Sequence, residues 1–411
     1  MQICIISFLI VLLDIITGKG FKRTFPKFSA LHWRGIRMAF IIQSAVSVAI
    51  VVGGFILQRY VADYRLIAGY YYLFGIIVLL YFPKSVFVSF MFADWVIFKI
   101  HRWYRLRTSD LFCRSRFTVS KCGFWTGIVM MGLFVWGIFF GRYNFTIDQV
   151  EISAESLPVE FNGYKIIQIS DIHAGSFAGS AKRFQKAIDM INHQSPDLVV
   201  FTGDMVNNFA DEAIPLTPVF SQLDACDGKF AVLGNHDYGG YTYWDTPADS
   251  MANHDALKNA IERMGFVILN NQSITITRCD SACIALIGTE NWGVEERHPK
   301  QADLNKAMES IHDIPFKVLL AHNPLFWPKE VEGKTDIALT LAGHTHGMQM
   351  GVKLGKRRYS PAMFKFLHWG GLYQTGKQYL YVNRGLGVIA FPGRIGMSPE
   401  ITLITLWKEK Y

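Results

Sequence analysis

Four long apolar segments in the first third of this 411-residue chain restrict its fold most strongly. They cover residues 3–17, 38–57, 66–82 and 122–141. Each approaches or reaches the roughly 20 residues that an α-helix needs to cross a bilayer, although the first is short and contains Asp14. We therefore expect an α-helical membrane region over residues 1–145 and a second domain over residues 150–411.

A fifth apolar stretch, at residues 85–100, is ambiguous. Sixteen helical residues cover about 24 Å, less than the roughly 30 Å of the hydrocarbon core, and Asp94 lies inside the stretch. The stretch either lies in the membrane interface or forms a further crossing. The membrane region is therefore expected to have four helices, or five if this stretch crosses as well.

The number of crossings decides which side of the membrane the second domain faces. Basic residues concentrate in two loops, with six Lys and Arg in residues 18–37 and seven in residues 99–121. Basic loops favour the cytoplasmic side. Four crossings place both loops inside and the second domain outside, whereas five keep that domain in the cytoplasm. The charge pattern favours four crossings in a multi-pass protein of the inner or plasma membrane, and the side stays open.

The positive charge of the chain belongs to the membrane region. Residues 1–141 contain 16 Lys and Arg against 4 Asp and Glu, and the remaining residues contain 25 against 29. A strongly basic protein can bind nucleic acid, but here the basic residues lie between apolar segments. This pattern indicates a lipid bilayer as partner, and no nucleic acid is expected.

From about residue 150 the sequence changes to short β-branched runs that alternate with helical patterns. Buried strands are predicted at residues 164–170, 197–203, 229–234, 283–288, 317–322 and 337–343. Helices are predicted around residues 181–192 and 256–264, the second of them before a strand at residues 266–270. The second domain is therefore expected to be an α/β unit.

Polar side chains follow five of these strands. The segments are Asp171-Ile172-His173, Gly203-Asp204, Gly234-Asn235-His236-Asp237, His322-Asn323-Pro324 and Gly343-His344-Thr345-His346-Gly347. Ligands of open α/β sheets collect beyond the carboxyl ends of the strands. Along an extended backbone, residues two apart point the same way, so His344 and His346 are expected to face one small ion site. Five such segments in this order indicate a site built at the sheet edge.

The side chains in these segments suit hard or borderline metal ions. They offer carboxylate, imidazole and amide groups without thiolate, which favours Mn, Fe or Zn over a structural zinc site. The cysteines form no C-x-x-C pattern, and Cys279 and Cys283 either pair in an oxidising compartment or stay free. One carboxylate can bridge two cations that share an activated water. We therefore expect two divalent metal ions.

The pattern DxH…GD…GNHD…H…GHxH resembles the signature of the calcineurin-like metallophosphoesterases. The resemblance implies a four-layer fold with two mixed β-sheets flanked by helices. It implies that Asp171, His173 and His346 hold one metal, that Asn235, His322 and His344 hold the other, and that Asp204 bridges them. His236 would stabilise the transition state or protonate the leaving oxygen, with Asp237 orienting it, while a metal-bridging hydroxide attacks phosphorus in line.

The C-terminal part contains the segments GHTHGMQM, LGKRRYSPAMFKF, GLYQTGKQYLYVNRGLG and SPEITLITL. With these segments it resembles the membrane-anchored or exported branch of this family. That branch includes bacterial phosphodiesterases and UDP-2,3-diacylglucosamine pyrophosphatases of lipid A biosynthesis. The loop of residues 353–369 is either a solvated excursion or, because it follows the ligand turn directly, the rim of the site. In the second case Lys356, Arg357 and Arg358 would meet phosphate, and Phe364, Phe366 and Trp369 would meet an acyl chain or the bilayer. Arg384 is a further candidate for substrate binding. Asn207 and Asn208 are either substrate contacts or turn residues.

Two functions from different classes follow. The first is a membrane-anchored hydrolase of a phosphodiester or pyrophosphate, with a lipid-linked or nucleotide-lipid substrate as its finer specificity. The second is a catalytically silent phosphoesterase fold that acts as a membrane-tethered binding scaffold. Because the chain keeps all seven metal ligands and His236, the sequence favours the enzyme.

Overall fold

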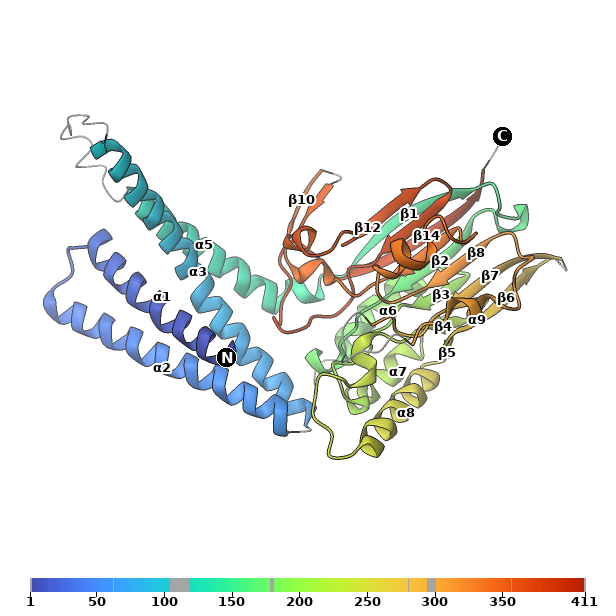
Figure 1. Cartoon of the computed structure of the whole chain (residues 1–411), viewed down its shortest axis with the longest axis horizontal. Helices are drawn as coiled ribbons and strands as arrows, with labels where there is room; N and C mark the ends of the chain where they lie inside the picture. Colours follow the sequence, from blue (N-terminus) through green and yellow to red (C-terminus); the bar gives the residue numbers. More distant parts are fainter. Residues whose placement is uncertain are drawn as a thin grey trace. The chain divides into compact units, whose positions relative to one another are not determined.

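The computed structural model divides the chain into two compact units (Figure 1). It describes residues 2–61, 63–103, 118–177, 181–279, 281–293, 301–355 and 357–409. One unit comprises Met1–Val61 with Gly69–Ile138, and the other comprises Ala62–Ala68 with Phe139–Tyr411. Each unit is described below by itself.

The first unit consists of long apolar helices. These are α1 (Gln2–Thr24), α2 (Ala30–Tyr60), α3 (Tyr64–Trp103) and α5 (Thr118–Phe139). Among the described residues, four helices are long and apolar enough to cross a membrane. Residues 85–100 form no separate fifth helix, because α3 runs without a break through Pro83 over 40 residues, or about 60 Å. Residues 104–117 of the second basic loop lie outside the described residues.

Two acidic side chains inside the apolar helices have partners on neighbouring helices. The buried carboxylate of Asp14 accepts hydrogen bonds from Ser44 Oγ and Tyr81 OH, each at 2.6 Å, and forms an ion pair with Lys84. Asp94 on α3 accepts from the backbone N–H of Ser120 on α5 at 2.7 Å. These contacts connect α1 with α2 and α3, and α3 with α5.

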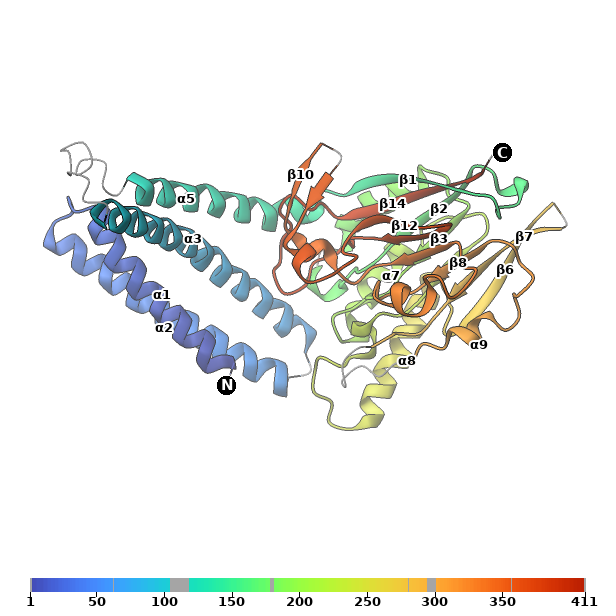
Figure 2. The same ribbon diagram turned by 45° about the horizontal axis from the view of Figure 1, so that its top comes forward.

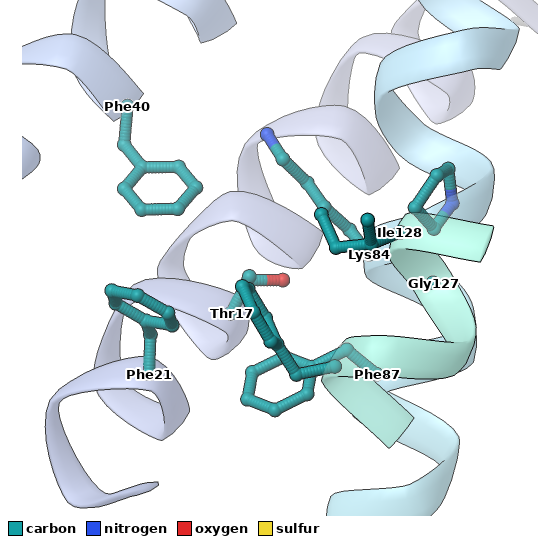
Figure 3. A pocket seen from close by; sticks show the side chains of 9 residues that line it. Thr17, Phe21, Phe40, Lys84, Phe87, Gly127 and Ile128 are labelled. Atoms are coloured by element: carbon teal, nitrogen blue, oxygen red, sulfur yellow. The ribbon is translucent and has the colours of Figure 1, made fainter. Parts of the chain in front are cut away.

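A cavity of about 240 Å³ lies among the four helices of this unit (Figure 3). Its wall is aromatic and aliphatic apart from Thr17 and Lys84. Gly127 allows α5 to approach α3, since a Cβ atom there would lie 3.0 Å from the carbonyl oxygen of Pro83. Close packing at small residues is typical of helix pairs in membranes.

The second unit contains two mixed six-stranded sheets (Figures 1 and 2). The first has the order β1-β14-β2-β3-β4-β5, with strands Thr146–Ala154, Glu400–Lys408, Tyr164–Ile169, Leu198–Phe201, Lys229–Ala231 and Val267–Ile268. The second has the order β12-β13-β9-β8-β7-β6, with strands Gly371–Thr375, Gln378–Val382, Leu339–Ala342, Lys317–Leu320, Ala282–Gly288 and Gln272–Arg278. A short hairpin of β10 (Val352–Leu354) and β11 (Arg357–Tyr359) stands apart from both sheets.

Alternating strand residues build three apolar layers. Ile166 of β2 packs between the two sheets, while its neighbour Ile167 faces helices α6 (Gln185–Asn192), α7 (Thr217–Phe220) and α8 (Pro247–Arg263). On the second sheet, Val318 faces inward and Leu319 faces α9 (Leu304–Met308). The result is helices, sheet, sheet and helices, which confirms the predicted four-layer fold.

The connectivity brings five strand ends together. Strands β2, β3 and β4 are parallel neighbours, as are β8 and β9, so their carboxyl ends gather beyond the sheets. Strands β1 and β14 complete the first sheet and were not predicted. Cys279 and Cys283 are free in this structure.

Candidate metal centre

Sharp left-handed turns separate the strands from the candidate ligands. Asp171, His173, Asp204, His344 and His346 all have positive φ angles, between 47° and 74°. Such a backbone is uncommon for residues other than glycine and costs about 1–3 kcal/mol at each position. The sequence suggested an extended backbone at His344 and His346, but both residues lie in a left-handed turn. The turn sends the two imidazoles to different partners.

One group of side chains contains Asp171, His173, Asp204 and His346, all of them buried. His173 Nε2 lies 3.0 Å from His346 Nε2 and 3.6 Å from Asp204 Oδ2. His346 Nε2 lies 3.2 Å from Asp171 Oδ1. Four donor atoms thus converge within 4.8 Å of one another, which fits a small divalent cation.

A second group contains Asp204, His322 and His344. His322 Nε2 lies 3.2 Å from Asp204 Oδ2, 3.2 Å from His344 Nδ1 and 3.1 Å from Asn235 Oδ1. Its other ring nitrogen, Nδ1, lies 2.7 Å from the carbonyl oxygen of Thr202, which fixes the ring. Asp204 belongs to both groups through the same oxygen atom, Oδ2.

Burial sets the protonation of these ligands. It lowers the pKa of His173 and of His344 to about 3, so that both imidazoles are neutral and offer a lone pair. It also raises the pKa of Asp171 to about 7. The pKa of Asp204 is well below its ordinary value, because the attraction of the neighbouring histidines outweighs the opposing effect of burial. At His322, burial disfavours the charged imidazole, but the attraction of Asp204 and Asp171 outweighs this effect and raises the pKa to about 9. A metal ion at His322 would therefore displace a proton, whereas His173 and His344 are already neutral.

His236 lies beside both groups and is half-buried. Its Nδ1 is 2.8 Å from the carbonyl oxygen of Asn207, and its backbone N–H donates to Asp204 Oδ1 at 2.9 Å. The ring of Tyr241 stacks on its ring with centroids 4.2 Å apart. A proton on Nδ1 that donates to the carbonyl leaves Nε2 for exchange with a substrate.

The carboxylate of Asp237, to which the resemblance assigns the orientation of His236, contacts the backbone around Asp204. Its Oδ2 accepts the backbone N–H groups of Asp204 and Gly234 at 2.8 and 2.9 Å, and its Oδ1 accepts that of Met205 at 2.8 Å. The carboxylate therefore holds the backbone segments that carry Asp204 and His236, while the His236 ring itself contacts the carbonyl oxygen of Asn207.

Several supporting residues could not be found from the sequence. Asn207 Oδ1 lies 3.0 Å from His173 Nδ1 and supports that ligand ring. Asn208 Oδ1 accepts the backbone N–H of Tyr241, whose ring stacks on His236. Glu212 accepts four backbone N–H groups in this region, including those of Gly175 and Asn207. Tyr241 OH lies 2.7 Å from Asn235 Nδ2. An Asn-Asn pair after Asp204 was the one signal in the sequence.

Of the three arginines predicted to bind substrate, two are in ion pairs and one is exposed. Arg384 is 3% exposed and pairs with Asp148 and with Glu400, the latter at 2.7 Å. Arg358 pairs with Asp148 at 2.8 Å, whereas Arg357 is exposed on β11. Lys356 lies outside the described residues.

The aromatic residues of the same loop differ in whether they contact the ligand turn or face outward. The Phe366 ring lies 6.0 Å from the His344 ring, and the Trp369 carbonyl oxygen accepts a hydrogen bond from Thr345 Oγ1 at 2.6 Å. Phe364 is 88% exposed. The loop is therefore attached to the ligand turn while part of it faces outward.

Comparison with known proteins agrees with this geometry. Residues 164–348 match the family described as calcineurin-like phosphoesterase. The metallophosphoesterase YkuE of Bacillus subtilis is 31% identical over 257 residues, which cover 62% of this chain and 83% of YkuE. The phosphodiesterase YaeI of Escherichia coli is 29% identical over 59% of this chain and 82% of its own length.

A vertebrate relative is named as a transmembrane protein. The transmembrane protein with metallophosphoesterase domain of Danio rerio is 28% identical over 68% of this chain and 61% of its own length. The four-layer fold, the two ligand groups that share Asp204 and the family match together define a metal-dependent phosphoric ester hydrolase. The chain belongs to the calcineurin-like metallophosphoesterase family.

Proposed function

We propose that this chain is a membrane-anchored hydrolase of a phosphodiester or pyrophosphate that uses two divalent ions of Mn, Fe or Zn. Asp171, His173 and His346 would hold one ion; Asn235, His322 and His344 would hold the other; Asp204 would bridge them. The observation that carries the proposal is the shared oxygen: Asp204 Oδ2 lies 3.6 Å from His173 Nε2 and 3.2 Å from His322 Nε2. A single carboxylate between two ligand groups is the arrangement that two neighbouring cations require.

The ions would supply Lewis acidity and an activated water, and the protein would supply the proton for the leaving oxygen. His236 suits that task because it is half-buried at the edge of the site and its ring is fixed on one side by Asn207 and on the other by Tyr241. Phosphoryl chemistry of this kind depends mainly on positioning and on electrostatic stabilisation.

We further propose a lipid-linked substrate such as UDP-2,3-diacylglucosamine, which would place the protein in lipid A biosynthesis. The apolar helices support this proposal, because they would hold the site near a bilayer. The phosphate contacts would come from Arg357, Arg358 and Arg384. A phosphate would have to displace Asp148 from Arg358, and Asp148 or Glu400 from Arg384, whereas Arg357 is already exposed.

The test uses the purified full-length protein in detergent with Mn²⁺. Hydrolysis of bis-p-nitrophenyl phosphate and of UDP-2,3-diacylglucosamine is measured for the wild type, for Asn235→Ala and for His236→Ala. His312→Ala, at an exposed histidine outside the motifs, is the matched control. Metal content is measured in parallel.

The outcomes separate the alternatives. Turnover of the nucleotide lipid that both variants lose would support the full proposal. Turnover of the diester alone would keep the hydrolase and remove the lipid substrate. Bound metal without any turnover would favour the binding scaffold.

A further inference from the structure

An exposed apolar surface follows directly after the ligand turn. We call it the hairpin face, and it consists of Val352, Leu354, Tyr359, Met363, Phe364 and Leu367. Phe364 and Leu367 are 88% and 77% exposed, and the other four are between 43% and 65% exposed. Single exposed apolar residues are common on proteins, but six within sixteen residues indicate an interaction surface.

The hairpin places part of this surface on one side. Strands β10 and β11 pair with Val352 opposite Tyr359 and Leu354 opposite Arg357. Because residues two apart and residues directly opposite share a side of a β-ladder, Val352, Leu354, Tyr359 and Arg357 project the same way. The other side contains Lys353 and Arg358, and Arg358 forms an ion pair with Asp148.

The chain segment that contains the hairpin face has charged side chains of one sign. The sequence contains no Asp or Glu between Asp336 and Glu400. Lys353 and Arg357 are exposed on the hairpin, and Lys365 lies between Phe364 and Phe366. Apolar side chains beside exposed cations are the composition of a segment that lies in the headgroup region of an anionic bilayer.

Direct contacts connect the hairpin face to the metal centre. Ser360 Oγ donates to the carbonyl oxygen of Gly347 at 2.6 Å, one residue beyond His346. At the other end of the loop, Thr345 Oγ1 donates to the Trp369 carbonyl oxygen. The Phe366 ring meets the His344 ring between these points. Whatever binds the hairpin face is therefore held beside the ligands.

We propose that the hairpin face docks on the surface of an anionic phospholipid bilayer. Its apolar side chains would enter the boundary between headgroups and acyl chains, while Arg357 and Lys365 meet lipid phosphates. The bilayer is the fitting occupant because the chain's own apolar helices bring one into reach and because the local charge is complementary to it. The docking does not depend on the hydrolysis proposed above, although it would explain access to a lipid-linked substrate.

The test measures amide hydrogen exchange of the full chain by mass spectrometry. The protein is placed in detergent, in nanodiscs of phosphatidylcholine, and in nanodiscs that also contain phosphatidylglycerol. We expect peptides covering residues 348–368 to exchange more slowly in the anionic discs than in the neutral discs or in detergent. Peptides covering α8 serve as the internal reference and should exchange equally in all three.

Two sets of variants test the two components of the surface. Phe364→Ser with Leu367→Ser should abolish the protection, and so should Arg357→Glu with Lys365→Glu. The matched controls are Met251→Ser, at an apolar residue that is 68% exposed on α8, and Lys306→Glu, at an exposed lysine on α9, and both should keep it. Unchanged melting temperatures would show that the variants fold.

Three outcomes would overturn the docking. Equal exchange in anionic and neutral discs would remove the recognition of charge. Equal exchange in discs and detergent would remove the bilayer altogether. Protection that appears in detergent and grows with protein concentration would assign the hairpin face to a second copy of the chain.

Discussion

The candidate metal centre is held in place by residues that are not among its candidate ligands. The sequence predicts all seven candidate ligands because each follows a strand in a recognisable motif, and the structure brings them into two groups around Asp204. The support could not be predicted in the same way. Asn207, Glu212 and Tyr241 reach the site through loops whose course depends on tertiary contacts.

Tyr241 offers a test of this support. Its hydroxyl lies 2.7 Å from Asn235 Nδ2, which fixes the amide whose Oδ1 faces His322. We expect Tyr241→Phe to weaken binding of the second ion by about 10- to 100-fold, as is usual for the loss of a hydrogen bond to a metal ligand. Calorimetric titration with Mn²⁺ measures this. Tyr243→Phe, at an exposed tyrosine two residues away, should bind as the wild type does, and an equal affinity in both variants would contradict the role.

Asp237 is predicted to matter for folding and for the position of Asp204. Its two oxygen atoms accept the N–H groups of Asp204, Gly234 and Met205. Asp237→Ala leaves these buried donors without an acceptor and should lower the free energy of unfolding by about 3 kcal/mol or more. Chemical denaturation, followed by a spectroscopic signal of the second unit, measures the loss in the free energy of unfolding. Asp224→Ala, at an exposed carboxylate, is the control. If Asp237→Ala lost no more free energy of unfolding than this control, water would have replaced the carboxylate.

At the scale of elements, local patterns located the strands that carry ligands, and long-range pairing explains what they left out. Strand β1 pairs with β14 across 254 positions of sequence, so neither strand shows its partner locally. Helix α8 begins at Pro247, earlier than its apolar pattern suggests, because Thr246 caps it by accepting the N–H of Asp249. Helix α3 passes through Pro83, a residue that usually ends helices in water but is tolerated in membrane helices.

Lys84 follows Pro83 and gives α3 a charge whose partner lies 70 residues earlier in the chain. Removing one member of the Asp14–Lys84 pair leaves an uncompensated charge among apolar helices. We expect Asp14→Asn to destabilise the full chain by about 3 kcal/mol and Asp14→Asn with Lys84→Met to recover most of this loss. Thermal unfolding in detergent measures both. Lys22→Met, at an exposed lysine of α1, is the control, and additive effects of the two changes would exclude a coupled pair.

At the scale of the whole molecule, the continuous α3 bears on topology. The ambiguous residues 85–100 extend the third helix, so four helices of sufficient length and apolarity are found among the described residues. If each of them crosses once, the basic residues of 18–37 and 99–121 lie together on the cytoplasmic side. The catalytic unit then faces away from the cytoplasm, a topology that favours a lipid-linked phosphodiester over the nucleotide lipid as substrate.

We therefore expect a C-terminal alkaline phosphatase fusion to be active and a C-terminal green fluorescent protein fusion to be dark in a bacterial host. A fusion point at residue 110, in the second basic loop, should give the opposite pair of signals. Fluorescence at the C-terminus would instead show an odd number of crossings and a cytoplasmic active site.

Metal binding should be visible in the stability of the whole protein, because the two ligand groups gather from strand ends that are far apart in the unfolded chain. A ligand that binds only the folded state stabilises it by about 2.7 kcal/mol at a concentration 100 times its Kd. We expect chelator to lower the melting temperature of the full chain in detergent and Mn²⁺ or Zn²⁺ to restore it. Asn235→Ala removes one ligand of one group only, so it should reduce the restored shift without abolishing it. Since the effect arises from binding alone, it would persist in His236→Ala even if hydrolysis is lost, and a melting temperature indifferent to metal would contradict the dinuclear centre independently of any substrate.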